Sequence, residues 1–162
     1  MDEQAAGIGV APMDVILSYD GLSFLQAMIA GKMPAPPITE TLGFTLVEVE
    51  HGRAVFAGMP AFAYYNPINV VHGGWAATLL DSALGCAVMS TLAKREAYTT
   101  LEIKVNLVRA ITKDTGRVIS EARILHRGRT IGTAEAYLRD EAGKLYAHGT
   151  TTCAIFPAKA GG

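Results

Sequence analysis

The amino-acid sequence predicts one α+β domain in which an antiparallel β-sheet wraps around a single long helix. The first observation is the segment VVHGGWAATLLDSALGCAVMSTLA, residues 70–93, whose only charged residue is Asp81. A helix that is apolar on every side must be surrounded by protein. The second observation is that consecutive hairpin patterns follow this segment, and consecutive hairpins form an antiparallel sheet. The length of 162 residues suits one domain.

Three features are predicted ahead of the central helix. Residues 23–30, followed by Gly31, suit a short amphipathic helix with a glycine stop. The Pro-rich stretch 34–37 separates this N-terminal arm, residues 1–39, from a domain at 40–157 and a tail at 158–162. Residues 44–50 and 53–57 flank a His-Gly turn and predict a β-hairpin.

The central helix is predicted to follow a loop at 61–71 and to end near Lys94 and Arg95, cations that suit a helix C-terminus. Residues 99–107 then alternate between apolar and polar side chains, which is the period of a half-buried strand. Further strands are predicted at 117–125, 130–138 and 145–156. Small side chains within these strands favour close approach of the helix: Ser120, Ala122, Ala134 and Ala136.

Composition excludes several classes of function. Charged residues make up 18% of the chain, below the roughly 25% usual for soluble domains, which indicates extra buried surface in a homodimer or homotetramer. A net charge of −1 without a basic run argues against nucleic acid as a partner. Cys86 and Cys153 have no paired spacing and the N-terminus lacks signal-peptide features, so we expect a cytoplasmic protein. Four scattered histidines indicate no metal site.

Two alternatives compete with a catalytic interpretation of Asp81. The segment 70–93 is long enough to cross a membrane, but it contains three glycines and four hydroxyl residues. A central Asp also costs about 2.5 to 3.5 kcal/mol on insertion scales, so we expect no membrane span. The second alternative is a core helix whose Asp81 only hydrogen-bonds to backbone.

The combination of Asn66, His72-Gly73-Gly74 and Asp81 decides the interpretation. With the acid eight residues after the histidine, inside a buried helix between hairpins, residues 40–156 resemble the hotdog-fold acyl-CoA thioesterases of the phenylacetate-degradation type. The resemblance implies hydrolysis of an acyl- or aryl-CoA thioester to the free acid and CoA. It implies no cofactor, because coenzyme A is part of the substrate.

The resemblance also implies roles for these residues. Asp81 matches the acid that acts as general base toward water or as nucleophile. The N–H of Gly73 or Gly74 is expected to stabilise the negative thioester oxygen at the helix mouth. Asn66 matches an amide near the acid, with a turn-forming role as the alternative. His72 matches the histidine that orients the loop or contacts the thioester, unless its role is structural.

Further candidates come from position along the chain. Thr99 shares the alternation phase of Leu101 and Ile103 and is therefore predicted to point inward toward Asp81. The resemblance implies a hydroxyl there that holds the attacking water in the partner subunit's half-site; Thr100 is the alternative if a bulge shifts the register. Trp75 either shapes the acyl pocket or anchors the core.

The phosphates of coenzyme A need cations and backbone donors. The densest basic turn is Arg127-Gly128-Arg129, and a solvated hairpin tip is the alternative interpretation. Arg109 and Lys104 precede it. The chain departs from its relatives at Asn69 and Val70, where they commonly carry glycine.

Two other functions fit a hotdog unit: an acyl-thioester dehydratase or hydratase, and a non-catalytic acyl-CoA-binding regulator. A dehydratase pairs an acid with a histidine placed for proton transfer, whereas His72 lies at the helix mouth. A DNA-binding regulator needs a helix-turn-helix or basic segment, which the sequence ahead of the domain lacks. Release of free CoA distinguishes hydrolysis from both.

Overall fold

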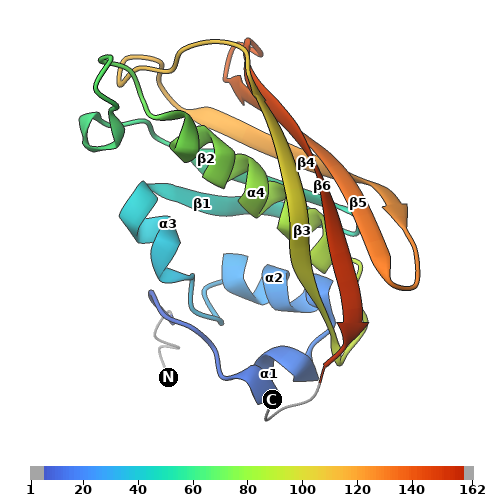
Figure 1. Cartoon of the computed structure of the whole chain (residues 1–162). Helices are drawn as coiled ribbons and strands as arrows, with labels where there is room; N and C mark the ends of the chain where they lie inside the picture. Colours follow the sequence, from blue (N-terminus) through green and yellow to red (C-terminus); the bar gives the residue numbers. More distant parts are fainter. Residues whose placement is uncertain (1–5, 159–162) are drawn as a thin grey trace.

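A computed structural model describes residues 6–158. Its strands form one curved antiparallel sheet, and the longest helix lies against that sheet (Figure 1). In chain order the elements are α1 (Met13–Ser18), α2 (Gly21–Ile29), α3 (Pro37–Leu42), β1 (Phe44–Glu50), β2 (Arg53–Gly58), the 3-10 helix η1 (Phe62–Tyr64), α4 (Gly73–Met89), β3 (Glu96–Leu107), β4 (Val118–Arg127), β5 (Ile131–Asp140) and β6 (Leu145–Pro157).

The strand order in the six-stranded sheet is β1-β2-β4-β5-β6-β3. Every neighbouring pair is antiparallel. The predicted α+β hotdog arrangement, with a sheet around one central helix, is therefore confirmed. The order also leaves β1 and β3 as the two edges of the sheet, and β3 is the longer of the two.

The side of α4 that faces the sheet forms the centre of the core. Its fully buried side chains are Leu79, Leu80, Ala83, Leu84, Ala87 and Val88. Each buried leucine stabilises the fold by about 1.5 to 3 kcal/mol. The small strand residues predicted to admit the helix, Ser120, Ala122, Ala134 and Ala136, are all fully buried, which confirms that prediction.

The opposite side of α4 corrects the sequence prediction. Asp81 and Gly74 are exposed, and Thr78, Ser82 and Cys86 are only partly buried. The helix is therefore not surrounded by its own chain, because the sheet and the N-terminal arm leave one stripe of it uncovered. The apolar composition of α4 predicted that the helix is buried. Composition does not show whether its own chain or a second molecule covers each face.

The helix also ends earlier than the cations at 94 and 95 suggested. Its last residue is Met89, and Ser90 follows as a buried cap. The Ser90 hydroxyl donates to the Ala87 carbonyl at 2.8 Å and accepts from the Gly52 N–H at 2.8 Å. The C-terminal end of α4 is thereby joined to the β1–β2 turn, so a hydroxyl rather than a charge ends the helix.

The N-terminal arm, which contains α2, packs beside α4 (Figure 1). The predicted amphipathic helix is confirmed as α2; the short helices α1 and α3 were not predicted. The N–H of Gly21 donates to the Leu92 carbonyl at 3.0 Å. A Cβ at Gly21 would collide with the Met89 carbonyl, so this close approach requires glycine. Most of the predicted tail, residues 158–162, lies outside the described residues.

Among residues 6–158, no helix has both the length and the apolar character needed to cross a bilayer.

Candidate active site

The mouth of α4, its N-terminal end at residues 72–74, presents one backbone N–H without a hydrogen-bond partner in the described structure. The ring Nδ1 of His72, the N-cap residue, accepts from the Gly74 N–H at 2.8 Å, and the His72 carbonyl accepts from the Trp75 N–H at 2.9 Å. Among the described residues, the Gly73 N–H has no such partner. Helix dipole and open N–H together favour negative oxygen at Gly73. Of the two glycines considered, the geometry favours Gly73.

His72 itself is exposed at this mouth. Because its Nδ1 accepts a hydrogen bond, the neutral ring carries its proton on Nε2. The ring therefore both caps the helix and offers a donor to the solvent side. The two roles considered for this histidine are compatible in one geometry.

The loop before the helix is held by Asn66. Its Oδ1 accepts from the N–H groups of Ile68 at 3.1 Å and Val70 at 3.3 Å. The turn-forming role is thus what its oxygen performs, while its Nδ2 has no hydrogen-bond partner among the described residues. Asn69 adopts the left-handed conformation with φ 64°, which explains how this chain replaces glycine in the loop.

The carboxylate of Asp81 lies midway along α4 on its uncovered side. Within residues 6–158 it makes no hydrogen bond or ion pair under the usual distance criteria, so the alternative of a backbone-bonded core acid finds no support. Its solvent shell is restricted by apolar neighbours, and this desolvation raises the pKa of Asp81 above its ordinary value. The predicted buried acid is instead an unpaired acid at the edge of a cavity.

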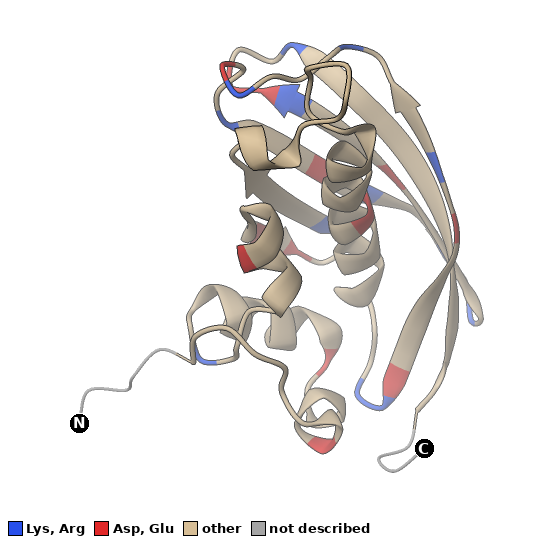
Figure 2. Ribbon diagram, turned by 60° about the vertical axis from the view of Figure 1, so that its left-hand side comes forward, with Lys and Arg blue, Asp and Glu red and all other residues tan. Residues whose placement is uncertain are grey.

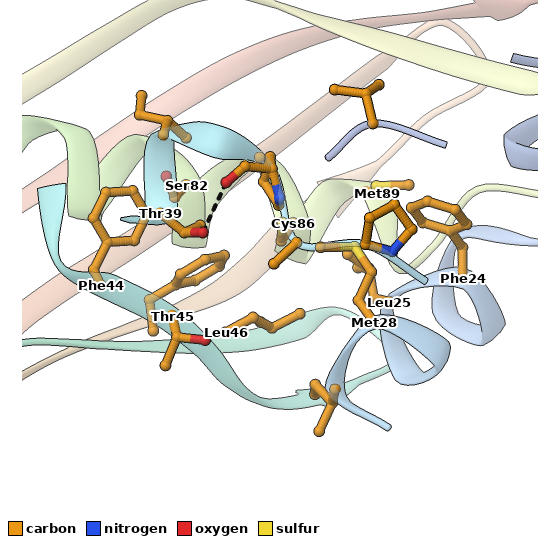
Figure 3. A pocket seen from close by; sticks show the side chains of 18 of the residues that line it. Phe24, Leu25, Met28, Thr39, Phe44, Thr45, Leu46, Ser82, Cys86 and Met89 are labelled. Atoms are coloured by element: carbon orange, nitrogen blue, oxygen red, sulfur yellow. Dashed lines mark hydrogen bonds between the residues drawn. The ribbon is translucent and has the colours of Figure 1, made fainter. Parts of the chain in front are cut away.

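That cavity has a volume of about 440 Å³ and extends from α4 to the N-terminal arm. Figure 3 shows Ser82, Cys86 and Met89 of α4 on one side and Phe24, Leu25 and Met28 of α2 near the Met89 end. Sequence reasoning missed the arm as part of the site, because its apolar residues have the same pattern as any packed helix.

Of the two threonines considered on β3, it is Thr100 that lines this cavity. Thr100 pairs with buried Cys153 across β3 and β6, whereas Thr99 pairs with Ala154 on the opposite face. The ladder shifts register between Thr100 and Glu102, which places Leu101 in a bulge. The predicted inward orientation of Thr99 is therefore wrong, because the bulge reverses the alternation phase that Ile103 shows.

Comparisons with known proteins agree with this geometry. The sequence model of the Thioesterase superfamily matches residues 68–147. The 1,4-dihydroxy-2-naphthoyl-CoA hydrolase of Listeria monocytogenes (serotype 1/2a, strain 10403S) is 28% identical over 73% of this chain and 94% of its own length. A solved conserved protein from Pseudomonas aeruginosa is 34% identical, with a TM-score of 0.69 over 74% of this chain and 94% of that one.

The chain belongs to the thioesterase superfamily. A phenylacetic acid degradation-related protein from Ralstonia eutropha JMP134 is also similar, at 28% identity and a TM-score of 0.73 over 81% of this chain and 98% of that structure. The prediction of a hotdog-fold thioester hydrolase is confirmed at the level of the family.

In this thioesterase, Trp75 anchors the core and does not line the cavity. Its side chain is 3% exposed, and its indole N–H donates to the Leu42 carbonyl at 2.8 Å. Its ring stacks on Tyr64 with centroids 5.7 Å apart. Of the two roles considered for Trp75, these contacts favour the core anchor, because the first turn of α4 directs this side chain toward α3 and η1.

The basic β4–β5 turn lies far from the helix mouth of its own chain. Gly132 approaches Val88 near the C-terminal end of α4, whose 17 residues span about 25 Å. The Arg127 guanidinium donates to the Glu96 carboxylate at 2.7 Å and so joins the turn to the start of β3. For Arg127 the phosphate-binding prediction thus competes with an ion pair already formed.

In the described structure, the other cations predicted to bind phosphate form no ion pair with Glu96. Arg129 is exposed beside Gly128 at the tip of the turn, and Lys104 lies on the face of β3 that points away from α4. Arg109 follows β3 in a segment that reaches the helix mouth, where the Val71 N–H donates to the Ile111 carbonyl at 2.9 Å. Of the predicted cations, Arg109 is the nearest in sequence to Ile111, the residue that contacts this mouth.

Proposed function

We propose that this thioesterase hydrolyses acyl-CoA at a site that joins Asp81 of one subunit to the helix mouth of a second. The observation that carries the proposal is the spacing between Gly73 and Asp81 on one straight helix. Eight residues at about 1.5 Å each separate them by about 12 Å. A carbonyl under attack must lie about 3 Å from both its oxyanion donor and its attacking group. One chain cannot supply both groups to one thioester.

The chemical roles follow from the contacts. Asp81 acts as general base toward water, or as nucleophile through a mixed anhydride, and its pKa, raised by desolvation, suits either role. The Gly73 N–H stabilises the oxyanion as the carbonyl becomes tetrahedral. The carbon–sulfur bond then breaks, and in the general-base route the CoA thiolate takes up the proton that Asp81 removed from water. In the nucleophile route the thiolate is protonated from solvent, and water then hydrolyses the mixed anhydride to release the acid and free Asp81. His72 and Asn66 hold the mouth and offer Nε2–H and Nδ2–H to the substrate.

A second copy of the chain finds a suitable surface at β3. This edge strand exposes Leu101 to 59%, Leu107 to 58% and Ile103 to 36%. Long, apolar edge strands are templates for pairing with another chain. The opposite edge, β1, is shorter and exposes two charges of the same sign, Glu48 and Glu50, whereas the exposed charges of β3, Glu102 and Lys104, are opposite in sign. These features support a dimer through β3, with a tetramer of two dimers as its extension.

We expect Leu101→Asp to convert the oligomer to monomers at micromolar concentration and to abolish most of the activity. The reason is that the substitution places a charge in the centre of the apolar edge. Light scattering measures the mass. Leu125→Asp is the matched control, because Leu125 on β4 is also 59% exposed and lies away from this edge. A fully active Leu101→Asp monomer would contradict the two-subunit site.

A second prediction separates the two neighbouring threonines. Thr100→Val removes the hydroxyl that lines the cavity with Asp81, and we expect kcat to fall roughly tenfold because a water or thioester contact is lost. Thr99→Val, on the opposite face of the strand, is the isosteric control and should leave kcat unchanged. Steady-state kinetics with one acyl-CoA decide; the reverse ranking would restore Thr99.

The overall proposal is tested by incubating the purified chain with acyl-CoA thioesters and a thiol reagent. Hydrolysis releases free CoA; a dehydratase or hydratase modifies the acyl group and leaves the thioester intact, and a binding protein does neither. We propose no cofactor, since coenzyme A enters with the substrate. The two free thiols, Cys86 and Cys153, fit the cytoplasmic location that we propose.

A further inference from the structure

The cavity beside Asp81 is built largely by the N-terminal arm. More than half of the residues that line it belong to residues 9–39. Along α4 it extends from Asp81 to Met89, which at about 1.5 Å per residue is about 12 Å of helix. Figure 3 places Phe24, Leu25 and Met28 of α2 near its Met89 end. The volume of about 440 Å³ falls in the ~300–1,000 Å³ range of ligand sites and far exceeds what an acetyl group fills.

The arm's share of the lining disfavours charged ligands, and the arm as a whole carries few charged residues (Figure 2). Asp81 is the only charged side chain in it, and none of the lining residues is Lys, Arg or His. The hydroxyl of Thr39 donates to the Pro36 carbonyl at 2.7 Å, and that of Thr78 donates to the Gly74 carbonyl at 2.8 Å. A carboxylate placed against the arm would lose its hydration without gaining a partner, which is strongly unfavourable.

The arm is fixed to the rest of the chain and to itself. Gly21 contacts the end of α4 through its hydrogen bond to Leu92, and the Ala6 N–H donates to the Gly31 carbonyl at 2.8 Å. Ile8 and Ala35 form a β-bridge. The residues that match the thioesterase superfamily begin only at 68. The wall that the arm provides is thus outside the matched part, where chains of one family are free to differ in specificity.

We propose that the N-terminal arm, residues 6–39, forms the acyl-binding wall of the site and selects uncharged acyl chains of medium length. Acetyl groups leave the wall unfilled, and acyl groups that end in a carboxylate have no partner there. This inference rests on the proposed function and names the substrate class of the same site. The thioester lies at Asp81, and the acyl chain extends along α4 toward α2.

The first test uses the unmodified chain with acetyl-, hexanoyl-, decanoyl- and adipoyl-CoA. Each buried methylene should raise kcat/KM about fourfold until the cavity is filled. Adipoyl-CoA has the chain length of hexanoyl-CoA but ends in a carboxylate, and we expect its kcat/KM to be at least about 10²-fold lower. A flat profile, a preference for acetyl-CoA, or equal rates for the hexanoyl and adipoyl thioesters would overturn the inference.

The second test shortens the cavity from the arm. Met28→Trp adds volume to a lining residue, and we expect the ratio of kcat/KM for decanoyl-CoA to kcat/KM for acetyl-CoA to fall at least about tenfold. Met13→Trp is the matched control, because Met13 on α1 is 56% exposed and does not line the cavity. An equal loss with both substrates would show that the arm is not the acyl wall.

Binding without turnover separates this inference from the proposed function. In an Asp81→Asn background, decanoyl-CoA should raise the melting temperature more than acetyl-CoA at equal concentration, because tighter binding to the folded state gives a larger shift. If no acyl-CoA is hydrolysed by the unmodified chain, the proposed function fails, yet the melting temperatures still report on the arm. Equal shifts with both thioesters would reject the acyl wall even in an active enzyme.

Discussion

Replacing Asp81 by asparagine should leave the fold intact and lower kcat by at least about 10²-fold, the scale of lost acid–base catalysis. The carboxylate has no structural partner among the described residues, so its removal breaks no hydrogen bond or ion pair. Asparagine keeps the shape but can neither accept a proton from water nor attack the thioester. Steady-state kinetics with the best acyl-CoA substrate measure the loss. Near-normal turnover would remove Asp81 from the mechanism.

The same substitution should raise thermal stability at neutral pH. Desolvation raises the pKa of Asp81 in the folded chain above its ordinary value. Ionising this carboxyl therefore costs stability in the folded chain. The stability present below the pKa of the unfolded chain is lost as pH rises through the pKa of the folded chain. Asparagine avoids this cost, so its advantage should be largest at pH 7 and should shrink as pH falls toward 4. Asp14→Asn, at an exposed site on α1, controls for net charge.

The pH dependence of turnover should follow the same titration. As general base or nucleophile, Asp81 must be ionised, so kcat should fall as pH drops through its raised pKa. The acid limb should therefore lie above the ordinary range of an aspartate. In the Asp81→Asn variant the residual rate should lose this limb.

The sequence predicted the regular elements well because periodicity and turn residues are local signals. The two hairpins after α4, the β1–β2 hairpin and α2 all follow from such patterns. The wrong orientation predicted for Thr99 also has a local cause, but the sequence does not reveal it. A single bulge at Leu101 reverses the strand face, and no residue type in Thr99-Thr100-Leu101 marks it.

Burial of a helix by a distant segment or by another molecule, unlike secondary structure, has no local signal in the sequence. The composition of α4 predicted that the helix is covered, and the chain covers only part of it, leaving Asp81 exposed. The cavity likewise depends on how the arm folds back on α4 through Gly21 and Leu92. Such contacts between segments far apart in sequence have no characteristic residue spacing from which they could be predicted. The motif residues predicted the chemistry that we propose, whereas the cavity beside the arm and the uncovered stripe of α4 emerge only in the folded structure.

Gly73→Pro should lower kcat by about 10²- to 10³-fold, the usual effect of losing one oxyanion donor. The substitution removes only the N–H that has no partner in the described structure. Proline is favoured at the first position of a helix, and the preceding residue, His72, already has the extended φ −59° and ψ 133° that proline requires. The backbone of α4 should therefore be preserved.

Gly73→Ala is the matched control, since it adds a Cβ and keeps the N–H. A Cβ there meets only the far end of the flexible Leu107 side chain, which can shift by rotation. We therefore expect at most a small loss for alanine and the large loss only for proline. Similar losses in both variants would show that space near Leu107, rather than the donor, limits the reaction.

Mixing the two inactive variants then tests which subunits form one site. In a mixed dimer of Asp81→Asn and Gly73→Pro chains, a site shared between subunits is intact once: it combines Asp81 from the proline chain with the Gly73 N–H from the asparagine chain. Random pairing makes half of the dimers mixed, so about one quarter of the normal activity should return. Sites confined to one chain would regain nothing, because every chain in the mixture carries a defect. Co-expression with two different affinity tags isolates the mixed dimer, whose activity should be about half that of the unmodified dimer. An inactive mixed dimer would contradict the two-subunit site, because it would show that Asp81 and the Gly73 donor act together within one chain.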